Sequence, residues 1–233
     1  MAERVAVLAA HPDDETLGAA GAMLWHLRRG DAVHVVVATD GVTARHSESA
    51  RQEECLRRAM ARLGVDSVHT LSLPDQQLDA MPLLEVIGAL QSVLEPIRPT
   101  VLYLHAAGDV NQDHRALHAA GLVLARPGSG VHTLRAYEVP SSSEWTPPGS
   151  LPPFVPNCFL DITEWMEEKL AAFAEYADTH ESEVKPFPHP RSPEMLTAFA
   201  QRRGLALGPG RSAEAFMTLR EIHSSHNTPE VSG

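Results

Sequence analysis

The chain has 233 residues, of which 43% are hydrophobic and 21% charged, and its formal net charge is −11. This length suits one α/β domain with a complete sheet core. The acidic charge, the lack of a basic stripe and an aromatic content of 5% argue against binding to nucleic acid or an anionic membrane. No apolar run is long enough to span a membrane, and the N-terminus lacks a signal-peptide pattern. Cys55 and Cys158 lie far apart and outside any CxxC motif, so we expect reduced thiols and a cytoplasmic protein.

The first half of the chain alternates between apolar runs and amphipathic segments. The predicted strands are Val5–Ala10, Asp31–Thr39, Ser67–Leu73 and Thr100–His105. The predicted helices are Leu17–Leu27, Ala44–Leu63, Pro82–Leu94 and Gln112–Leu124. This alternation with short connections predicts an α/β fold, with a Rossmann-like, mostly parallel sheet and helices on both of its faces.

The second half is less regular and rich in proline. It contains predicted strands at His132–Val139 and Phe159–Ile162, an edge strand at Ala213–Leu219, and helices at Glu164–Thr179 and Pro193–Arg203. The loops at Pro140–Pro156 and Pro186–Pro193 are long, and long loops in compact domains are usually functional. No linker divides the chain, so we predict one domain over residues 1–223 and a flexible tail over 224–233.

The segment His11-Pro12-Asp13-Asp14-Glu15 ends the first predicted strand. Proline cannot donate to a sheet ladder, so the strand ends here, at the edge where parallel α/β sheets place their ligand sites. Capping of the following helix explains one acid, or two. It does not require a strand-end histidine followed by three acids, whose mutual repulsion costs energy unless a cation is present. The segment therefore favours a metal site.

A second polar segment, Asn111-Gln112-Asp113-His114, follows the fourth predicted strand. In a parallel sheet it returns to the same edge as the first segment. The alternative is a helix cap at Asn111 or Asp113 beside a surface histidine. Two imidazoles and one carboxylate with an open position are the ligand set of a catalytic zinc, and iron(II) is compatible with the same set. Asp13, next to a ligand but pointing elsewhere, is then a candidate general base.

These motifs resemble those of the PIG-L (LmbE-like) family of zinc-dependent N-deacetylases. The sequence AHPDDE and the later Asp113-His114 pair carry most of the resemblance. Weaker matches are Arg51 with Glu54, Leu63-Gly64-Val65, Leu73-Pro74-Asp75 and Ala213-Glu214-Ala215-Phe216. The resemblance extends over most of the chain and implies a Rossmann-like fold, in agreement with the pattern of elements.

The resemblance also implies roles for individual residues. It implies His11, Asp14 and His114 as metal ligands, Asp13 as general base, Asp113 as a group that orients a histidine, and Arg51 and Asp75 as substrate contacts. The substrate it implies is a small N-acetylated amino sugar or glycoconjugate.

The chain departs from the commonest family pattern at one position. Many members have His-Pro-Asp-His where this chain has Asn111-Gln112-Asp113-His114. Asn111 can donate a hydrogen bond to an oxyanion but cannot deliver a proton. His105, at the end of a strand, is a candidate for the missing acid, with a purely structural histidine as the alternative. Trp145 is a candidate to stack on a sugar ring, or else a packing anchor.

Three other functions compete with this prediction. A nucleotide-binding module requires a glycine-rich turn after the first strand, whereas this chain has acids that repel a pyrophosphate. A non-catalytic metal protein has no use for the spare carboxylate of Asp13. Hydrolysis of a non-sugar amide, such as an acylated natural-product intermediate, stays open, and both a monomer and a symmetric homo-oligomer fit the sequence.

Overall fold

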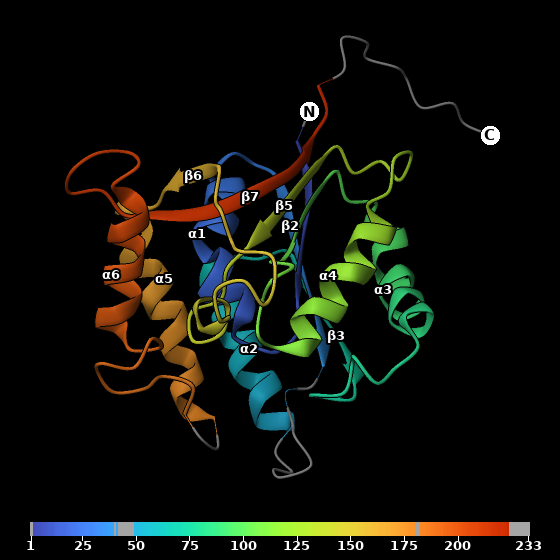
Figure 1. Ribbon diagram of the computed structural model, residues 1–233, viewed down its shortest axis with the longest axis horizontal. Helices are drawn as coiled ribbons and strands as arrows, with labels where there is room; N and C mark the ends of the chain where they lie inside the picture. The colour runs from blue at the N-terminus through green and yellow to red at the C-terminus, as the bar shows by residue number, and fades with distance from the viewer. Residues whose placement is uncertain (1, 40, 42–48, 180–181, 224–233) are drawn as a thin grey trace.

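The computed structural model describes residues 2–39, 41, 49–179 and 182–223, with the Ser49 side chain excepted. These residues form a seven-stranded sheet in the order β3-β2-β1-β4-β5-β7-β6 (Figure 1). Strands β1 to β5 are parallel, and β7 runs antiparallel to both of its neighbours. The strands are β1 (Arg4–Ala9), β2 (Ala32–Thr39), β3 (Ser67–Leu73), β4 (Val101–His105), β5 (Thr133–Tyr137), β6 (Cys158–Asp161) and β7 (Ala213–Glu221).

Helices cover both faces of this sheet. In Figure 1, α3 and α4 lie on one side, and α1, α2, α5 and α6 on the other. The α-helices are α1 (Asp14–Arg28), α2 (Ser49–Leu63), α3 (Leu83–Ile97), α4 (Gln112–Leu124), α5 (Met166–Phe173) and α6 (Pro193–Gly204). Short 3₁₀ helices are η1 (Ser143–Trp145), η2 (Thr163–Trp165) and η3 (Ala174–Asp178). The prediction of a single α/β domain with a mostly parallel, Rossmann-like sheet is confirmed.

Strand β1 is buried on both faces because successive side chains point to opposite sides of a sheet. Val5 and Val7 pack into the core beneath α1, α2 and α5. Ala6 and Leu8 pack into a second core beneath α3 and α4. This double burial explains the unbroken apolar run that predicted the strand, and it fixes the strand end from which the polar segment begins.

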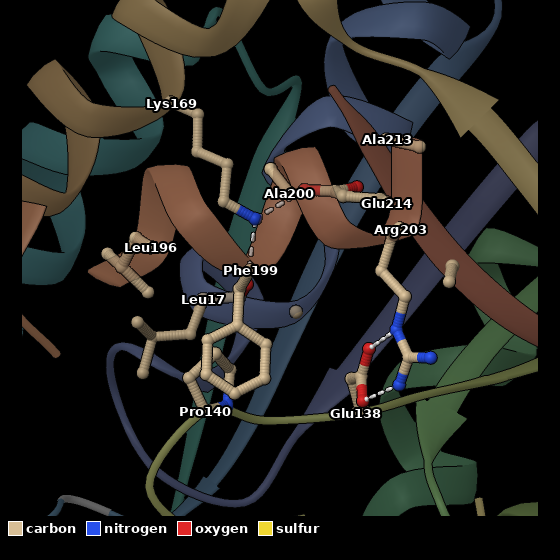
Figure 2. A pocket seen from close by; sticks show the side chains of 12 residues that line it. Leu17, Glu138, Pro140, Lys169, Leu196, Phe199, Ala200, Arg203, Ala213 and Glu214 are labelled. Carbon is tan, nitrogen blue, oxygen red and sulfur yellow. Dashed lines mark hydrogen bonds and ion pairs between the residues drawn. The ribbon is translucent and has the colours of Figure 1, made fainter. Parts of the chain in front are cut away.

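Helix α1 packs unusually close to the sheet through two glycines. A Cβ atom on Gly18 would lie 2.2 Å from the Tyr137 ring, and one on Gly21 would lie 2.3 Å from Ile162. A buried ion pair also contacts this helix, and its two atoms, Lys169 Nζ and Glu214 Oε1, are 2.6 Å apart (Figure 2). These contacts fix the position of α1 and therefore of the polar residues at its N-terminus.

Lys169 and Glu214 bond to the backbone of α1 as well as to each other. Lys169 donates to the Leu17 carbonyl oxygen at 2.8 Å. Glu214 accepts hydrogen bonds from the backbone N–H groups of Gly21 and Ala22 at 2.8 and 2.9 Å. The pair therefore serves the structure of α1, although Glu214 belongs to a motif that the family resemblance singled out.

The structure differs from the predicted elements at two places, and two further predictions fall partly or wholly outside the described residues. The strand expected at an edge, β7, lies inside the sheet between β5 and β6. The helix expected over Glu164–Thr179 is divided into η2, α5 and η3. The helix expected from Ala44 is described from Ser49 onward, and the expected tail lies outside the described residues. Among the helices that are described, none has both the length and the apolarity to cross a membrane.

Candidate metal centre

The polar segments meet at the carboxyl ends of β1 and β4. These two strands are adjacent, and the strand order reverses direction between them. Ligand sites of open α/β sheets lie at such a reversal. His11 follows the end of β1, and Asp14 is the first residue of α1. His114 lies in the first turn of α4.

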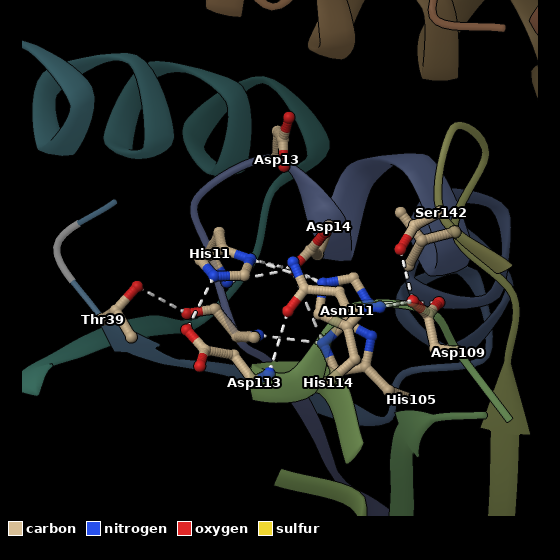
Figure 3. Close-up of polar contacts among 12 residues, drawn as sticks. His11, Asp13, Asp14, Thr39, His105, Asp109, Asn111, Asp113, His114 and Ser142 are labelled. Atoms are coloured by element: carbon tan, nitrogen blue, oxygen red, sulfur yellow. Dashed lines mark hydrogen bonds and ion pairs between the residues drawn. The ribbon is translucent and has the colours of Figure 1, made fainter. Parts of the chain in front are cut away.

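His11, Asp14 and His114 point toward one another (Figure 3). Asp14 Oδ2 lies 3.2 Å from His11 Nδ1 and 3.2 Å from His114 Nε2. The two ring nitrogens are 3.4 Å apart. Two imidazoles and a carboxylate with converging ligand atoms are a donor set that suits zinc or iron(II).

Each histidine has a carboxylate behind its other ring nitrogen. His11 Nε2 lies 3.1 Å from Asp113 Oδ2, and His114 Nδ1 lies 3.2 Å from Asp109 Oδ2. Metal-binding histidines typically have such a carboxylate, which fixes the ring and its tautomer. Asp113 is itself held by the backbone N–H groups of Gln76 and Leu78, at 2.8 and 2.9 Å. The geometry therefore fits a metal held by His11 Nδ1, Asp14 Oδ2 and His114 Nε2.

A second group of possible ligands consists of His11, Asp75 and Asp113. It uses the opposite ring nitrogen, because Asp75 Oδ1 and Asp113 Oδ2 both lie near His11 Nε2, at 3.2 and 3.1 Å. This group has one imidazole, and one of its carboxylates already accepts two backbone hydrogen bonds. We therefore favour the group with two imidazoles.

The electrostatic surroundings favour positive charge at this point. Burial lowers the pKa of His11, but hydrogen bonds with Asp113 and Asp14 act in the opposite direction and the net result is well above the usual value. Burial raises the pKa of Asp14, whereas the neighbouring His114 and His11 bring it well below its usual range. The cluster thus attracts protons in the absence of a metal, as an excess of carboxylates does.

Asp13 sits apart from the three converging groups. It is the N-cap residue of α1 but makes no side-chain capping hydrogen bond, so capping does not explain it. Its φ angle is 120°, in a region that L-residues rarely adopt. Burial raises the pKa of its carboxyl well above the usual value, although Arg191 acts in the opposite direction. A strained backbone that carries a buried acid is typical of an active site.

A cleft of about 210 Å³ opens beside these residues. His11, Asp13 and His114 form one part of its lining, and the predicted substrate residues Asp75 and Asn111 also line it. The remaining described residues that line it are Pro12, Gly41, Gln52, Gln76, Ser141, Ser142, Glu183 and Arg191. The polar character of this lining suits a ligand with many hydroxyl or amide groups.

Asn111 has a fixed orientation. Its Oδ1 accepts a hydrogen bond from the Asp113 N–H at 2.9 Å, which caps α4. The capping alternative for Asn111 is therefore correct. The cap also shows which atom of the side-chain amide is the oxygen and which is the nitrogen. The amide nitrogen, Nδ2, makes no hydrogen bond with any residue in the described part of the chain, so it can donate to a ligand. His114, in contrast, is 2% exposed, so the alternative of a surface histidine is excluded.

Arg51 and Trp145 are not among the described residues that line the cleft. Arg51 forms an exposed ion pair with Asp178 at 2.7 Å. Trp145 is 54% exposed, and its ring lies edge-on to His189 with 6.4 Å between the centroids. The structure gives neither residue a place beside the metal ligands.

His105 lies behind the ligands rather than in the cleft. It is fully buried and stacks on His114 with 3.9 Å between ring centroids. Its Nε2 accepts a hydrogen bond from the Ala10 N–H at 2.9 Å, and burial lowers its pKa well below the usual value. A neutral, enclosed imidazole of this kind packs against His114 and is not among the described residues that line the cleft, which favours the structural alternative over the candidate acid role.

Several residues at the site were not predicted from the sequence. Asp109 accepts hydrogen bonds from the Ser142 and Ser143 hydroxyls, the latter at 2.6 Å, and so attaches the 140–156 loop to the metal centre. Arg191 lies 2.7 Å from Asp13 Oδ2 and also pairs with Glu183. The only signal for this group in the sequence was that two long proline-rich loops were expected to be functional.

Comparison with known proteins agrees with this geometry. A model of the PIG-L family, described as GlcNAc-PI de-N-acetylase, matches residues 6–125, which hold all three candidate ligands and Asp13. The chain belongs to the PIG-L family. PIG-L proteins are a deacetylase family, so the coarse class of this enzyme follows from membership.

The chain is also similar to individual relatives and to solved structures. An uncharacterized deacetylase, YaiS, of Escherichia coli (strain K12) is 28% identical over 74% of this chain and 89% of its own. The 1D-myo-inositol 2-acetamido-2-deoxy-alpha-D-glucopyranoside deacetylase of Mycobacterium sp. (strain KMS) is 27% identical over 75% of this chain and 73% of its own. The N,N'-diacetylchitobiose deacetylase from Pyrococcus horikoshii superposes with a TM-score of 0.71 and 22% identity, over 93% of this chain and 83% of that one. The last comparison shows the fold alone.

Proposed function

We propose that this PIG-L protein is a zinc-dependent N-deacetylase that removes the acetyl group from an amino sugar or a related glycoconjugate. The observation that carries the proposal is the pairing of a two-histidine, one-carboxylate cluster with the separate carboxylate of Asp13 in one cleft. A structural metal site has no need of that carboxylate. The amino-sugar substrate is supported by what the Mycobacterium and Pyrococcus proteins are named for, and by the polar lining of the cleft.

His11, Asp14 and His114 would hold the metal, with iron(II) as an alternative to zinc. When bound, this ion supplies a Lewis acid that polarises the amide carbonyl and lowers the pKa of a coordinated water to about 7. Asp113 and Asp109 keep the two imidazoles in the tautomer that ligation requires. These two contacts hold the rings of the two histidines in the orientation that metal binding needs.

Asp13 acts as the general base in this proposal. It lines the same cleft as His11 and His114, and its side chain makes no capping hydrogen bond, so its carboxylate is available to take a proton from the attacking water. Because His105 is enclosed, we assign the second proton transfer to Asp13 as well. It returns the proton to the nitrogen of the departing amine.

Asn111 supplies a hydrogen bond to the developing oxyanion. Its Oδ1 is engaged by the backbone of α4, which leaves Nδ2 as the donor at the cleft. A donor placed before the reaction stabilises negative charge without reorganisation. This role suits an asparagine at the position where many relatives have histidine.

The substrate class is tested with two N-acetylated sugars and the metal-loaded protein. Acetate release is measured from N,N'-diacetylchitobiose and from 1D-myo-inositol 2-acetamido-2-deoxy-α-D-glucopyranoside, before and after removal of zinc by a chelator. We expect zinc-dependent release from at least one of them, and a decrease of about 10²- to 10⁴-fold in kcat for Asp13→Asn with the zinc content unchanged.

Two results would contradict the proposal in different ways. Full activity of Asp13→Asn would exclude Asp13 as the base. Zinc binding without acetate release from either sugar would point to the alternative substrate class, a non-sugar acylated metabolite, on which the same chemistry would act.

A further inference from the structure

Arg191 enters the cleft from a rigid position in the chain. It directly precedes the N-cap of α6, where Ser192 Oγ accepts a hydrogen bond from the Met195 N–H at 3.2 Å and Pro193 is the first helical residue. The Arg191 N–H also donates to His189 Nδ1 at 3.1 Å. The helix start therefore fixes the Cα position from which the guanidinium reaches the cleft.

The guanidinium joins three segments that are far apart in the sequence. Arg191 Nη1 lies 2.7 Å from Asp13 Oδ2 and also pairs with Glu183 Oε2, while Nε donates to Ser141 Oγ at 2.6 Å. The side chain is only 20% exposed. Because a planar guanidinium presents its donors in a fixed fork, these partners determine its orientation as well as its position.

Asp13 depends on this contact for its side-chain geometry. Its backbone is fixed, since its N–H donates to Glu15 Oε2 at 3.0 Å and its carbonyl accepts from the Thr16 and Leu17 N–H groups. Its carboxylate has no such local support. Among the residues that the structure describes, Arg191 is the one hydrogen-bond donor to that carboxylate.

We propose that Arg191 is a positioning residue that sets the direction of the Asp13 carboxylate in the cleft, with Glu183 and Ser141 holding Arg191 in place. The inference rests on the proposed role of Asp13 as general base. A proton acceptor must lie within hydrogen-bond reach of the water it activates, and a displacement of about 1 Å can cost about 10²-fold in rate. The late proline-rich loop thus contributes to the chemistry by orienting a group on the first loop.

A double-mutant cycle tests this role. The variants are Arg191→Met, Asp13→Asn and their combination, with Arg203→Met as a matched control. Arg203 is 21% exposed and forms an ion pair with Glu138 (Figure 2), and it is not among the described residues that line the cleft. Each protein is assayed for zinc content, thermal unfolding, kcat and KM on the two acetylated sugars named above.

We expect Arg191→Met to lower kcat by about 10²-fold, with KM and the zinc content unchanged. In the Asp13→Asn background the same substitution should have no further effect on kcat, because the group that Arg191 positions is then absent. Arg203→Met should leave kcat unchanged. Equal kcat in Arg191→Met and Arg203→Met would overturn the proposal, as would an undiminished effect of Arg191→Met when Asp13 is already replaced.

Two additions keep the test decisive. Arg191→Lys keeps the positive charge but cannot span the three partners with a planar fork, so a folded Arg191→Lys protein with wild-type kcat would also overturn the proposal.

The cycle is repeated with 4-nitrophenyl acetate, an activated ester without a sugar. If the wild type cleaves the ester in a zinc- and Asp13-dependent manner but neither sugar, the proposed substrate fails while the cycle on the ester still decides the role of Arg191.

Discussion

Helix α1 contacts two buried polar clusters, and they differ in how their charges are balanced. The Lys169–Glu214 pair is closed, since one cation faces one anion and both also bond to the helix backbone. The cluster at the N-terminus of α1 is open. There the carboxylates of Asp14, Asp109 and Asp113 converge on two histidines.

This difference separates a structural polar cluster from a functional one. A closed pair needs nothing from outside the protein, and it fixes the position of the helix. An open cluster carries negative charge that the protein itself does not offset, so it is stable only with bound protons or a cation. Burial alone does not distinguish the two, because the side chains in both are almost completely enclosed.

The largest effect is expected from zinc itself. Zinc at about 1,000 times its dissociation constant should add about 4 kcal/mol to the free energy of unfolding of the wild type. His114→Ala removes one of the two imidazoles and should abolish that gain. Differential scanning calorimetry with and without zinc measures it, and an equal gain in His114→Ala would place the ion elsewhere.

The closed pair should respond to loss of a charge with a large loss of stability. Lys169→Met leaves Glu214 buried without its cation, and we expect a decrease of about 3 kcal/mol in the free energy of unfolding. Adding Glu214→Gln to Lys169→Met should recover more than half of the lost free energy of unfolding, because neither residue of the pair is then charged. Urea denaturation measures both values, and zinc stoichiometry should be unchanged throughout. Equal stability of the single and double variants would argue against the ion pair as the cause.

An intermediate effect is expected from the carboxylate behind His114. Asp109→Asn should weaken zinc binding by about 10- to 100-fold, because the imidazole loses the partner that fixes its tautomer. Asp31→Asn is the matched control, since Asp31 makes a 2.7 Å contact with His26 at the opposite end of the sheet. Competition with a chromophoric chelator gives both affinities. A similar change in the two variants would mean that the effect is not specific to the metal centre.

The smallest effect concerns the stability of the metal-free protein. Burial raises the pKa of Asp13 in the folded state, so its ionised form opposes folding at neutral pH. This unfavourable contribution to folding disappears as the pH falls below the pKa that the Asp13 carboxyl has in the unfolded chain. Asp13→Asn should therefore raise the free energy of unfolding at pH 7 slightly and flatten its dependence on pH in the acid range. A loss of stability like that of Lys169→Met would contradict the contrast between the clusters.

The sequence predicts those parts of this molecule whose signals are local. The strand β1 and the residues His11 to Asp14 are contiguous, so an apolar run and a polar break sufficed to place them at a strand end. His114 required only the further rule that parallel strands end at one edge. The five parallel strands were predicted to within two residues for the same reason, because each is a buried apolar run.

The remaining parts depend on contacts between distant segments. Arg191 is 178 residues from Asp13, and a single arginine in a proline-rich loop carries no pattern of its own. The position of β7 inside the sheet depends on β6 pairing with it, which no periodicity reveals. For His105 the strand was predicted, but whether its ring faces the cleft or the space behind the ligands depends on packing against His114.

The most direct test of the account is the zinc K-edge absorption spectrum of the protein loaded with one equivalent of zinc. The account predicts two imidazole nitrogens and a carboxylate oxygen at about 2.0–2.2 Å, with one imidazole lost in His114→Ala. A spectrum with a single imidazole that is unaffected by His114→Ala would place the ion on His11, Asp75 and Asp113 instead. It would contradict the central claim that His11, Asp14 and His114 form the metal centre.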